Sequence, residues 1–583
     1  MSGWNFKILR IDLTTRTWTM ERPEPAVYHK FIGGKGLAGY YLSDHITRDW
    51  DDPAMPLLIF AGPLVGTPAP TSGRLTVMSR SPLTGTVGDA SVGGRFGTEL
   101  KKAGWDGIII SGRSQQACGI EIVDEQIVFT DATALKGGKT SEIYTRLKDK
   151  GAVASIGPAA DQRVRFASIM FDGHYAAGRN GLGTLVGAKN LKYITMKGTG
   201  KVPVSDLDGL KMAREEIFRM AAASPVLMGQ LGITNYGTAA VYDLTSSRRM
   251  MPTANFRKTY FDDAIQANAG TYHKKYQPKK SGCRGCHILC KKIGNDKRIL
   301  PEFETMNHFG PLLENADIEI ITRANAICNE MGMDTISAGA TLACYAEIEN
   351  KRLTGDEILS LLTAVANGSG IGKELGKGSY EFARSKGKSE VSMSVKRLEL
   401  PAYDPRGAYG MALGYAVSTR GGCHLRAYPI GNEILRKPVP TDRFTFSGKA
   451  RIVKIAEDAN AIIDSLTACK FIFFGATLEE YARAFTAVTG VESTGQDLSI
   501  IGERIYYAER IMNAKNGFNK IHDDLPQRFF KEPGSSGNNI EIQPIRRDDF
   551  LTARNNYYIV RGLDGNGLPT KEKAEELGLK WND

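Results

Sequence analysis

The segment from residue 281 to 290 carries three cysteines in the order Cys283-x-x-Cys286-x-x-x-Cys290. Thiolates with this spacing can surround one side of a metal centre and leave one coordination position open. An iron–sulfur cube needs four cysteine ligands, and one of them often comes from a distant part of the chain. Zinc is the competing metal, because it binds Cys and His ligands and His287 lies inside the motif. Three buried thiols without a metal are a third interpretation, which the density of cysteines disfavours.

Cys469 is the candidate for the fourth ligand of such a cluster, and it lies far downstream in Asp464-Ser-Leu-Thr-Ala-Cys469-Lys470. Eight cysteines in 583 residues do not form a disulfide framework. The other four stand singly in mixed surroundings and are expected to be reduced, ordinary residues: Cys118, Cys328, Cys344 and Cys423.

Three glycine-rich segments, each with Lys or Arg, lie in the first third of the chain. They cover residues 31–39, 89–97 and 177–192. None has the order of a P-loop or of a dinucleotide fingerprint. Backbone N–H groups and cations that converge in this way favour a ligand with phosphate groups. A domain with many tight turns is the alternative that the sequence leaves open.

The composition is that of a globular protein, with 42% hydrophobic and 24% charged residues. A length of 583 residues predicts two to four domains. The net charge of +11 favours an acidic partner, such as a small electron carrier. The basic residues are scattered, without the runs or aromatic motifs of nucleic-acid binding. No signal peptide and no membrane span are expected, which predicts a cytoplasmic protein.

The periodicity predicts an α+β protein with a β-rich domain at residues 1–203, which contains few helices. Short β-branched runs alternate with Gly and Pro turns, and residues 6–13 and 17–21 form a hairpin. A mixed or antiparallel sheet is expected from these and from further strands at 56–61, 74–79, 107–111, 120–130, 164–171 and 191–196.

Helical spacing begins after Pro203 and predicts two mostly helical domains, 204–400 and 401–583. Gly332 ends one helix of a pair within 318–350, and Asp334 either caps the next helix or faces a ligand. The stretch 401–416 is not expected to form a core helix, and the tail after 515 is expected to be rich in loops. Further helices are expected at 206–223, 356–366, 380–386, 451–464, 478–489 and 499–515.

The set of motifs resembles the tungsten-dependent aldehyde:ferredoxin oxidoreductases, and the likeness extends from Trp4 to the tail at residues 563–572. Five separated motifs in the family's order carry it: the cysteine motif with Cys469, Pro401-Ala-Tyr-Asp-Pro-Arg-Gly407, Arg420-Gly-Gly-Cys-His424-Leu-Arg426, the glycine loop at 181–192, and Asn329-Glu-Met-Gly-Met-Asp334.

The resemblance implies a β-rich domain that forms a saddle for two pyranopterins, with two helical domains closing over them. It implies tungsten or molybdenum held by the pterin dithiolenes, magnesium bridging the pterin phosphates, and a 4Fe-4S cluster on Cys283, Cys286, Cys290 and Cys469. Ferredoxin or a dedicated iron–sulfur subunit would accept the electrons. The resemblance leaves a homodimer or a hetero-oligomer open.

The implied cofactor-binding residues fall into three groups. Asp334 and Asp464 correspond to carboxylates that pair with the pterin edges, because such an edge offers two parallel N–H donors. Asn329 stands where the family has an aspartate, and Ser91 where an asparagine is expected. The remaining positions are basic residues, residues by the phosphates and neighbours of Cys469: Arg74, Arg426, Gly93, Arg179, Gly183, Thr184, Ala468 and Lys470.

The implied reaction converts an aldehyde and water to a carboxylic acid. Glu304 would move a proton, with Glu302 an equal rival by sequence, and His424 would donate a hydrogen bond to the carbonyl oxygen. One alternative keeps the cofactor and reduces aromatic thioesters at low potential. A metal-stabilised interaction protein without catalytic activity is the alternative of another class.

Overall fold

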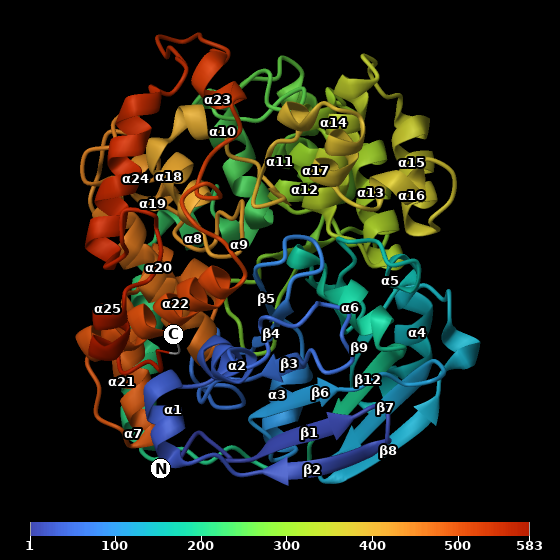
Figure 1. Cartoon of the computed structure of the whole chain (residues 1–583), viewed down its shortest axis with the longest axis vertical. Helices are drawn as coiled ribbons and strands as arrows, with labels where there is room; N and C mark the ends of the chain where they lie inside the picture. The colour runs from blue at the N-terminus through green and yellow to red at the C-terminus, as the bar shows by residue number, and fades with distance from the viewer. Residues whose placement is uncertain (1, 582–583) are drawn as a thin grey trace.

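The computed structural model describes residues 2–581, and Figure 1 shows two sheets at one end of the molecule with helices above and beside them. The first sheet has the strand order β2-β1-β6-β3-β4-β5. Its strands are β1 (Ile8–Asp12), β2 (Thr17–Glu21), β3 (Leu57–Phe60), β4 (Leu75–Arg80), β5 (Val87–Val92) and β6 (Gly107–Ser111). The hairpin of β1 and β2 is confirmed, and β1 pairs in parallel with β6 while the other pairs are antiparallel, so the sheet is mixed.

The second sheet has the order β11-β10-β9-β12-β7-β8. Residues 120–130 form two strands where one was expected, because Asp124 adopts a φ of 53° and the chain turns back there. The run 164–171 contributes only its last three residues. The strands are β7 (Cys118–Val123), β8 (Gln126–Asp131), β9 (Ala152–Ile156), β10 (Ile169–Phe171), β11 (Tyr175–Ala177) and β12 (Leu191–Lys197).

The expectation of few helices in this part is wrong, since two of the glycine-rich segments are helical. They form α2 (Gly34–Leu42) and α6 (Leu182–Ala188), and both helices are largely buried. Their glycines allow close backbone packing: a Cβ on Gly183 would lie 2.5 Å from the carbonyl oxygen of Ser168. Four more helices belong to this part: α1 (Pro25–Phe31), α3 (Phe96–Lys102), α4 (Thr140–Leu147) and α5 (Pro158–Asp161).

The helices expected after residue 203 are present. The Asp206 side chain accepts a hydrogen bond from the Gly209 N–H and caps α7 (Leu207–Ala223). Gly332, at a φ of 74°, ends α13 (Ile318–Met331), and the Asp334 carboxylate caps α14 (Thr335–Ile348). The other expected helices of this part are α15 (Gly355–Ala366) and α17 (Ser379–Ser385).

One expectation for the last third is wrong: the Gly-rich stretch near 401–416 contains α18 (Tyr409–Val417), which is buried along most of its length. The tail is rich in loops, as expected. It also contains α24 (Arg547–Arg561) and α25 (Lys571–Glu576), and Arg561 forms buried ion pairs with Glu457 and Asp458. Those carboxylates lie on α20 (Lys449–Leu466), which with α21 (Leu478–Thr489) and α22 (Gly495–Lys515) was expected.

The α+β class is confirmed: sheets with covering helices are followed by a largely helical remainder. One continuous hydrophobic core runs from Trp4 to Phe550 and joins the two parts. The boundaries at 203 and 400 stay predictions. Across residues 2–581, every helix is too short or too polar to cross a bilayer.

The end of α20 packs backbone to backbone against the start of α2 and the loop after β3. A Cβ on Gly62 would overlap the carbonyl group of Leu466, and one on Gly34 would overlap the carbonyl oxygen of Asp464. The Gly62 N–H also donates to the Thr467 hydroxyl at 2.9 Å. Only glycine lets the two backbones approach so closely, so this contact fixes where the residues after Asp464 lie.

We expect Gly62→Ala to lower the free energy of unfolding by about 1–3 kcal/mol, because the new methyl group overlaps immovable backbone. Chemical denaturation of the two proteins measures the difference. Gly565→Ala is the matched control, since no atom lies within 4 Å of its Cβ position. An equal loss in both variants would contradict the packing argument.

Candidate functional site

The cysteine motif forms the loop of a short hairpin, between β13 (Lys279–Ser281) and β14 (Lys291–Ile293). The Tyr175 hydroxyl donates to the Gly282 carbonyl at 2.8 Å and ties the loop to the second sheet. Gly93 lies directly after β5, and a Cβ there would overlap the Cys283 sulfur. Gly93, predicted to lie by the phosphates, therefore lies against the cysteine loop.

Cys469 reaches the same place from the end of α20. Thr467 ends that helix at a φ of 53°, and the Cys469 N–H donates to the Thr71 carbonyl at 3.1 Å. The pKa of the Cys469 thiol is raised to about 11. Burial is the main cause, Arg74 opposes the shift, and Cys286 and Cys283 add to it. The structure thus brings Cys469 to the loop cysteines.

The spacing of these thiols bears on the choice between zinc and an iron–sulfur cube. In a cube each thiolate binds a different iron, so the sulfurs lie farther apart than around one zinc ion. Between residues 2 and 581, no group of three or more His, Cys, Asp or Glu side chains is arranged to hold a single metal ion. The assignment of the four cysteines to a cluster rather than to zinc stays a prediction.

Arg74 lies between the cysteines and Asp464. Its guanidinium donates to the Ser91 hydroxyl at 2.9 Å and to the Ser91 carbonyl at 2.6 Å. Its pKa is raised, against the effect of burial, by Cys469, Cys283, Cys290 and Asp464. Ser91 therefore orients a cation that faces the cluster site.

Asp464 and Lys470 form an ion pair of 2.7 Å at the end of α20. Lys470 also donates to the Leu425 carbonyl at 2.9 Å, and Ala468 between them is fully buried. The second carboxylate oxygen of Asp464, Oδ1, is buried and has no hydrogen-bond partner among the described residues. One acceptor remains free for a ligand.

Arg179 and Asp334 form a second pair, with 3.2 Å between Arg179 Nε and Asp334 Oδ2. The Asp334 carboxylate also accepts from the N–H groups of Ile336 and Ser337, so its capping role is confirmed. Arg179 donates to the Glu399 carbonyl at 2.6 Å, while its Nη1 is buried without a partner in the described chain.

Glu304 and His424 meet at the centre of the site. His424 Nε2 lies 3.5 Å from Glu304 Oε1, and Glu304 Oε2 accepts from the Ala402 N–H at 2.8 Å. Burial raises the pKa of Glu304 to about 8. Burial, then Arg179, Arg420, Lys470 and His308, keep the pKa of His424 well below its usual value, so the imidazole is neutral.

Glu302, the rival of Glu304, points elsewhere. Its carboxylate pairs with Lys291 at 2.5 Å, and this cation lowers its pKa. Glu302 precedes α12 (Phe303–Phe309), whereas Glu304 lies in the first turn of that helix. The two carboxylates therefore have different neighbours: Glu302 faces Lys291, and Glu304 faces His424.

Sequence reasoning missed the residues around the Glu304–His424 pair. His308 is fully buried, and its Nδ1 lies 2.6 Å from the Glu304 carbonyl oxygen. Tyr403 and Tyr428 share a hydrogen bond of 2.9 Å between their hydroxyls, and their rings lie 5.8 and 6.1 Å from that of His424. The adjacency of Tyr403 to the 401–407 motif was the available signal.

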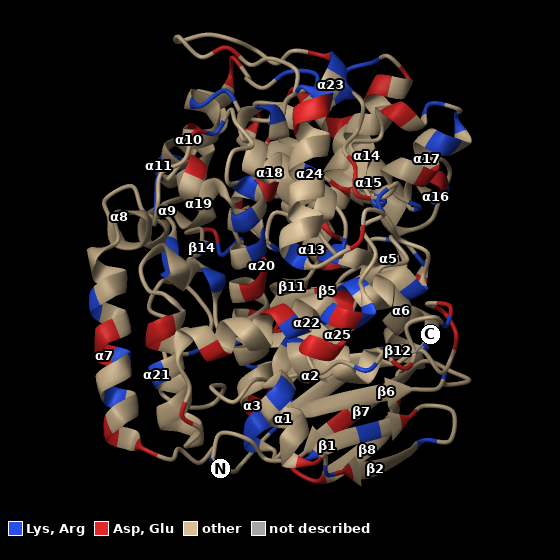
Figure 2. Ribbon diagram, turned by 60° about the vertical axis from the view of Figure 1, so that its left-hand side comes forward, with Lys and Arg blue, Asp and Glu red and all other residues tan. Residues whose placement is uncertain are grey.

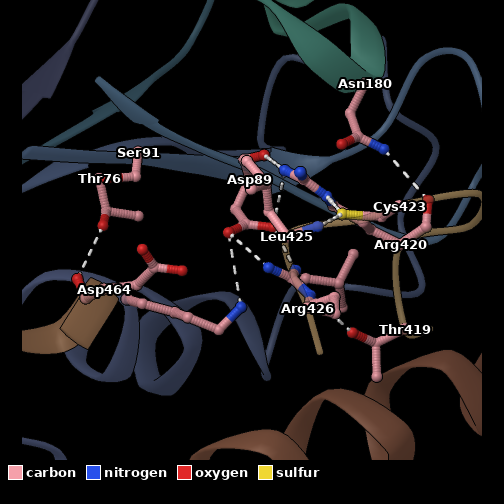
Figure 3. A network of polar contacts seen from close by, with 12 residues as sticks. Thr76, Asp89, Ser91, Asn180, Thr419, Arg420, Cys423, Leu425, Arg426 and Asp464 are labelled. Carbon is pink, nitrogen blue, oxygen red and sulfur yellow. Dashed lines mark hydrogen bonds and ion pairs between the residues drawn. The ribbon is translucent and has the colours of Figure 1, made fainter. Parts of the chain in front are cut away.

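Arg426 belongs to a buried charge network (Figure 3). Its guanidinium binds both carboxylate oxygens of Asp89, lies 3.5 Å from Glu509, and donates to the Thr419 hydroxyl at 3.1 Å. Lys35 pairs with the same two carboxylates. Sequence reasoning missed Lys35, Asp89 and Glu509, although the glycine-rich segments contain two of them. The cofactor role of Arg426 stays a prediction.

The other expected residues occupy varied positions. The Thr184 hydroxyl is already used, because it donates to the Val164 carbonyl. The Asn329 carbonyl accepts from the Thr140 hydroxyl at 2.8 Å, and Asn329 lies near the end of α13. Gly183 packs on the backbone at Ser168. Their roles toward phosphate, magnesium or pterin remain predictions.

The residues fit a pterin cofactor. Two carboxylates, Asp334 and Asp464, are each paired with a cation, and the free oxygen of Asp464 can accept an N–H from a pterin edge. Arg179 Nη1 offers a free donor beside Asp334. Buried polar atoms without partners are costly, so a bound polar group accounts for them.

Two family models cover nearly all of the chain. Residues 8–198 match the N-terminal domain of aldehyde ferredoxin oxidoreductase, and residues 212–579 match its domains 2 and 3. Tungsten-containing aldehyde ferredoxin oxidoreductases from Pyrococcus furiosus and Thermococcus kodakarensis are 38% and 37% identical, each over 98% of both chains.

Two more distant similarities extend this picture. The WOR-like subunit of an aliphatic sulfonate oxidoreductase from Pyrococcus furiosus is 28% identical over 99% of this chain and 97% of its own. The active-site complex BamBC of benzoyl coenzyme A reductase has the same fold, with a TM-score of 0.84 at 22% identity over 99% of this chain and 97% of that one. By its family models and its full-length relatives, the chain belongs to the tungsten-containing aldehyde ferredoxin oxidoreductase family and is an oxidoreductase.

Proposed function

We propose that this enzyme oxidises aldehydes to carboxylic acids at a tungsten or molybdenum bis-pyranopterin centre, with a 4Fe-4S cluster as the electron outlet. The observation that carries the proposal is the largely buried Glu304–His424 pair, which lies beside both the Arg179–Asp334 and the Asp464–Lys470 pairs. The metal centre, when bound, supplies a two-electron acceptor. Aldehyde and water give acid, two protons and two electrons.

The chain's own residues supply proton transfer and orientation. Glu304 has a pKa near working pH, so its carboxylate can take a proton from water and release it again. Neutral His424 can donate a hydrogen bond from its ring to the aldehyde oxygen. The rings of Tyr403 and Tyr428 flank His424 and limit the access of bulk water.

The electron path follows from the residues at the end of α20. Asp464 carries the free acceptor for the pterin, and Cys469 lies five residues later at the cluster loop. Arg74 faces both. We infer that one pterin lies next to the cluster, which gives a short path for electrons taken one at a time.

Reduction of aromatic thioesters is the competing reaction, and the likeness to the benzoyl coenzyme A reductase complex concerns the fold alone. The deciding experiment is anaerobic viologen reduction by the purified enzyme with a panel of aldehydes, together with metal analysis. We expect aldehyde-dependent reduction, with about one tungsten or molybdenum and about four irons per chain. Zinc as the only metal, or oxidation of dienoyl thioesters without aldehyde activity, would contradict the proposal.

We expect Glu304→Gln to lower kcat by at least about 100-fold, because the amide cannot take up the proton. Tungsten and iron contents should equal those of the wild type, since Glu304 holds neither metal. Glu302→Gln is the matched control and should keep most of the activity. Full turnover in Glu304→Gln would refute the assignment.

The pH profile tests the same group. A pKa of about 8 means that Glu304 is protonated below that pH and ionised above it. If the carboxylate acts as base, kcat/KM should rise with pH up to about 8 and then level off. A profile that falls with rising pH over this range would show that the protonated form is needed.

The electron carrier is expected to be a small acidic iron–sulfur protein. The segment 201–298, which contains the cysteine loop, has seventeen Lys and Arg and eight Asp and Glu, an excess of nine positive charges in a chain of net charge +11. Arg214 of α7 lies over the Phe218 ring, which contacts His287 of the loop. Figure 2 shows α7, α11 (Ala269–Tyr276) and β14 along one side of the molecule. This basic face meets a partly exposed cysteine loop.

The double variant Arg214→Glu and Lys274→Glu should raise the KM for an acidic ferredoxin roughly tenfold at low salt, because it weakens electrostatic attraction. Its viologen activity should be unchanged. Lys377→Glu with Lys388→Glu, on exposed positions outside the basic segment, is the charge-matched control. Equal effects of both double variants would argue against this docking face.

A further inference from the structure

Cys423, expected from the sequence to be an ordinary thiol, accepts two directed hydrogen bonds. Arg420 Nε lies 3.0 Å from its sulfur, and the Leu425 N–H lies 3.2 Å from it. The side chain is 1% exposed. Figure 3 shows the sulfur facing the Arg420 guanidinium, within the buried network around Asp89 and Arg426. His424 is the residue between the two backbone positions that this sulfur joins.

The contact with Leu425 has the pattern of an Asx turn. In that turn an aspartate accepts a hydrogen bond from the backbone N–H two residues later. A neutral thiol is a weak acceptor and a thiolate a strong one. Cys423 therefore takes the place of an aspartate, and a guanidinium donates to it as it would to a carboxylate.

The charges that act most strongly on Cys423 are positive. Burial alone raises the pKa of Cys423, but Arg420, Arg426, Arg179 and Lys470 together hold it below its ordinary value. These cations are also paired with carboxylates: Arg420 and Arg426 with Asp89, Arg179 with Asp334, and Lys470 with Asp464. Glu304, whose carboxyl group also interacts with Cys423, has a pKa of about 8 and is largely neutral at pH 7.

We propose that Cys423 is a buried thiolate and acts as a positioning residue: it closes the turn between Arg420 and Arg426 and so aims His424 at Glu304. The Leu425 carbonyl, which accepts from Lys470, and the Asn180 amide, which donates to the Arg420 carbonyl, hold the same turn from outside. The Cys423 sulfur holds the turn from inside, through its contacts with Arg420 Nε and the Leu425 N–H. The effect on turnover rests on the proposed function; the charge state of Cys423 does not.

The first test compares Cys423→Ser with Cys423→Asp in the holoenzyme. Serine keeps the size but is neutral, so kcat should fall about 10- to 100-fold, as expected for a lost hydrogen bond to a charged group. Aspartate restores the anion and should keep kcat within about threefold of the wild type. Equal kcat in the wild type and Cys423→Ser, or an aspartate variant no better than serine, would overturn the proposal. If serine prevents folding while aspartate permits it, the proposal is supported; if both prevent folding, it is overturned.

The second test measures thermal unfolding and does not depend on aldehyde activity. The thiol of an unfolded cysteine has a pKa of about 8.5, and the pKa of folded Cys423 is lower. The thiolate therefore stabilises the fold increasingly as the pH rises from the folded pKa to the unfolded one. The melting temperature of the wild type minus that of Cys423→Ser should therefore increase from about pH 6 to about pH 9, where Cys423 is ionised in both the folded and the unfolded protein. The difference in melting temperature between Cys423→Asp and Cys423→Ser should stay constant over this pH range. If the difference in melting temperature between the wild type and Cys423→Ser is constant or falls with rising pH, the proposal of a thiolate is overturned. A wild type inactive on aldehydes would refute the proposed function alone.

Discussion

The close approach of α20 to the glycine backbone of α2 and of the loop after β3 is the constraint on which the site depends. Gly34 and Gly62 leave no space for a side chain against the carbonyls of Asp464 and Leu466. The helix then ends at Thr467 in a left-handed conformation, and the next residues diverge from its axis. One backbone contact thus places the Asp464 carboxylate and the Cys469 sulfur in the same region, where we propose that the pterin and the cluster bind.

The second organising feature is the burial of charge. The cations and carboxylates of the site lie in buried or largely buried pairs, where water screens their charges little. These surroundings shift the two pKa values in opposite directions. The pKa of Glu304 is raised to about 8, while that of His424 is lowered, so the imidazole is neutral. A carboxyl group that exchanges protons near neutral pH and an imidazole that donates without a charge are what the proposed oxidation requires of the protein.

The sequence predicted the parts of the fold that have strong local signals. Asp334 caps its helix as expected, Gly332 ends the preceding one, and the first hairpin is in register. The helices α2 and α6 were missed because their glycines indicate turns, whereas tertiary packing on neighbouring backbone makes them helical. α18 was missed for the same reason.

The candidate site was predictable where a motif marks it and hidden where only the fold assembles it. Cys469 was named as the partner of the cysteine motif, while Asp464 and Glu304 came from the family resemblance. The structure places Cys469 by the loop cysteines and Glu304 by His424, and the roles of all three stay predictions. His308 and Glu509 carry no local signal, since their contacts are with partners that only the fold brings to them, and Lys35 was marked only as the cation of a glycine-rich segment. Cys423 carried no local signal, because a single cysteine reveals nothing about the arginine that faces its sulfur.

The central claim is that aldehyde oxidation at a site beside Glu304 and His424 delivers electrons to a cluster held by Cys469 and the loop cysteines. Rapid anaerobic mixing of the oxidised holoenzyme with an aldehyde, without any electron carrier, tests it most directly. The account predicts that the visible absorbance of the cluster bleaches within a single turnover and that carboxylic acid forms in proportion to enzyme. Acid formation without cluster bleaching, or no reaction in an enzyme that contains tungsten or molybdenum together with iron, would contradict it.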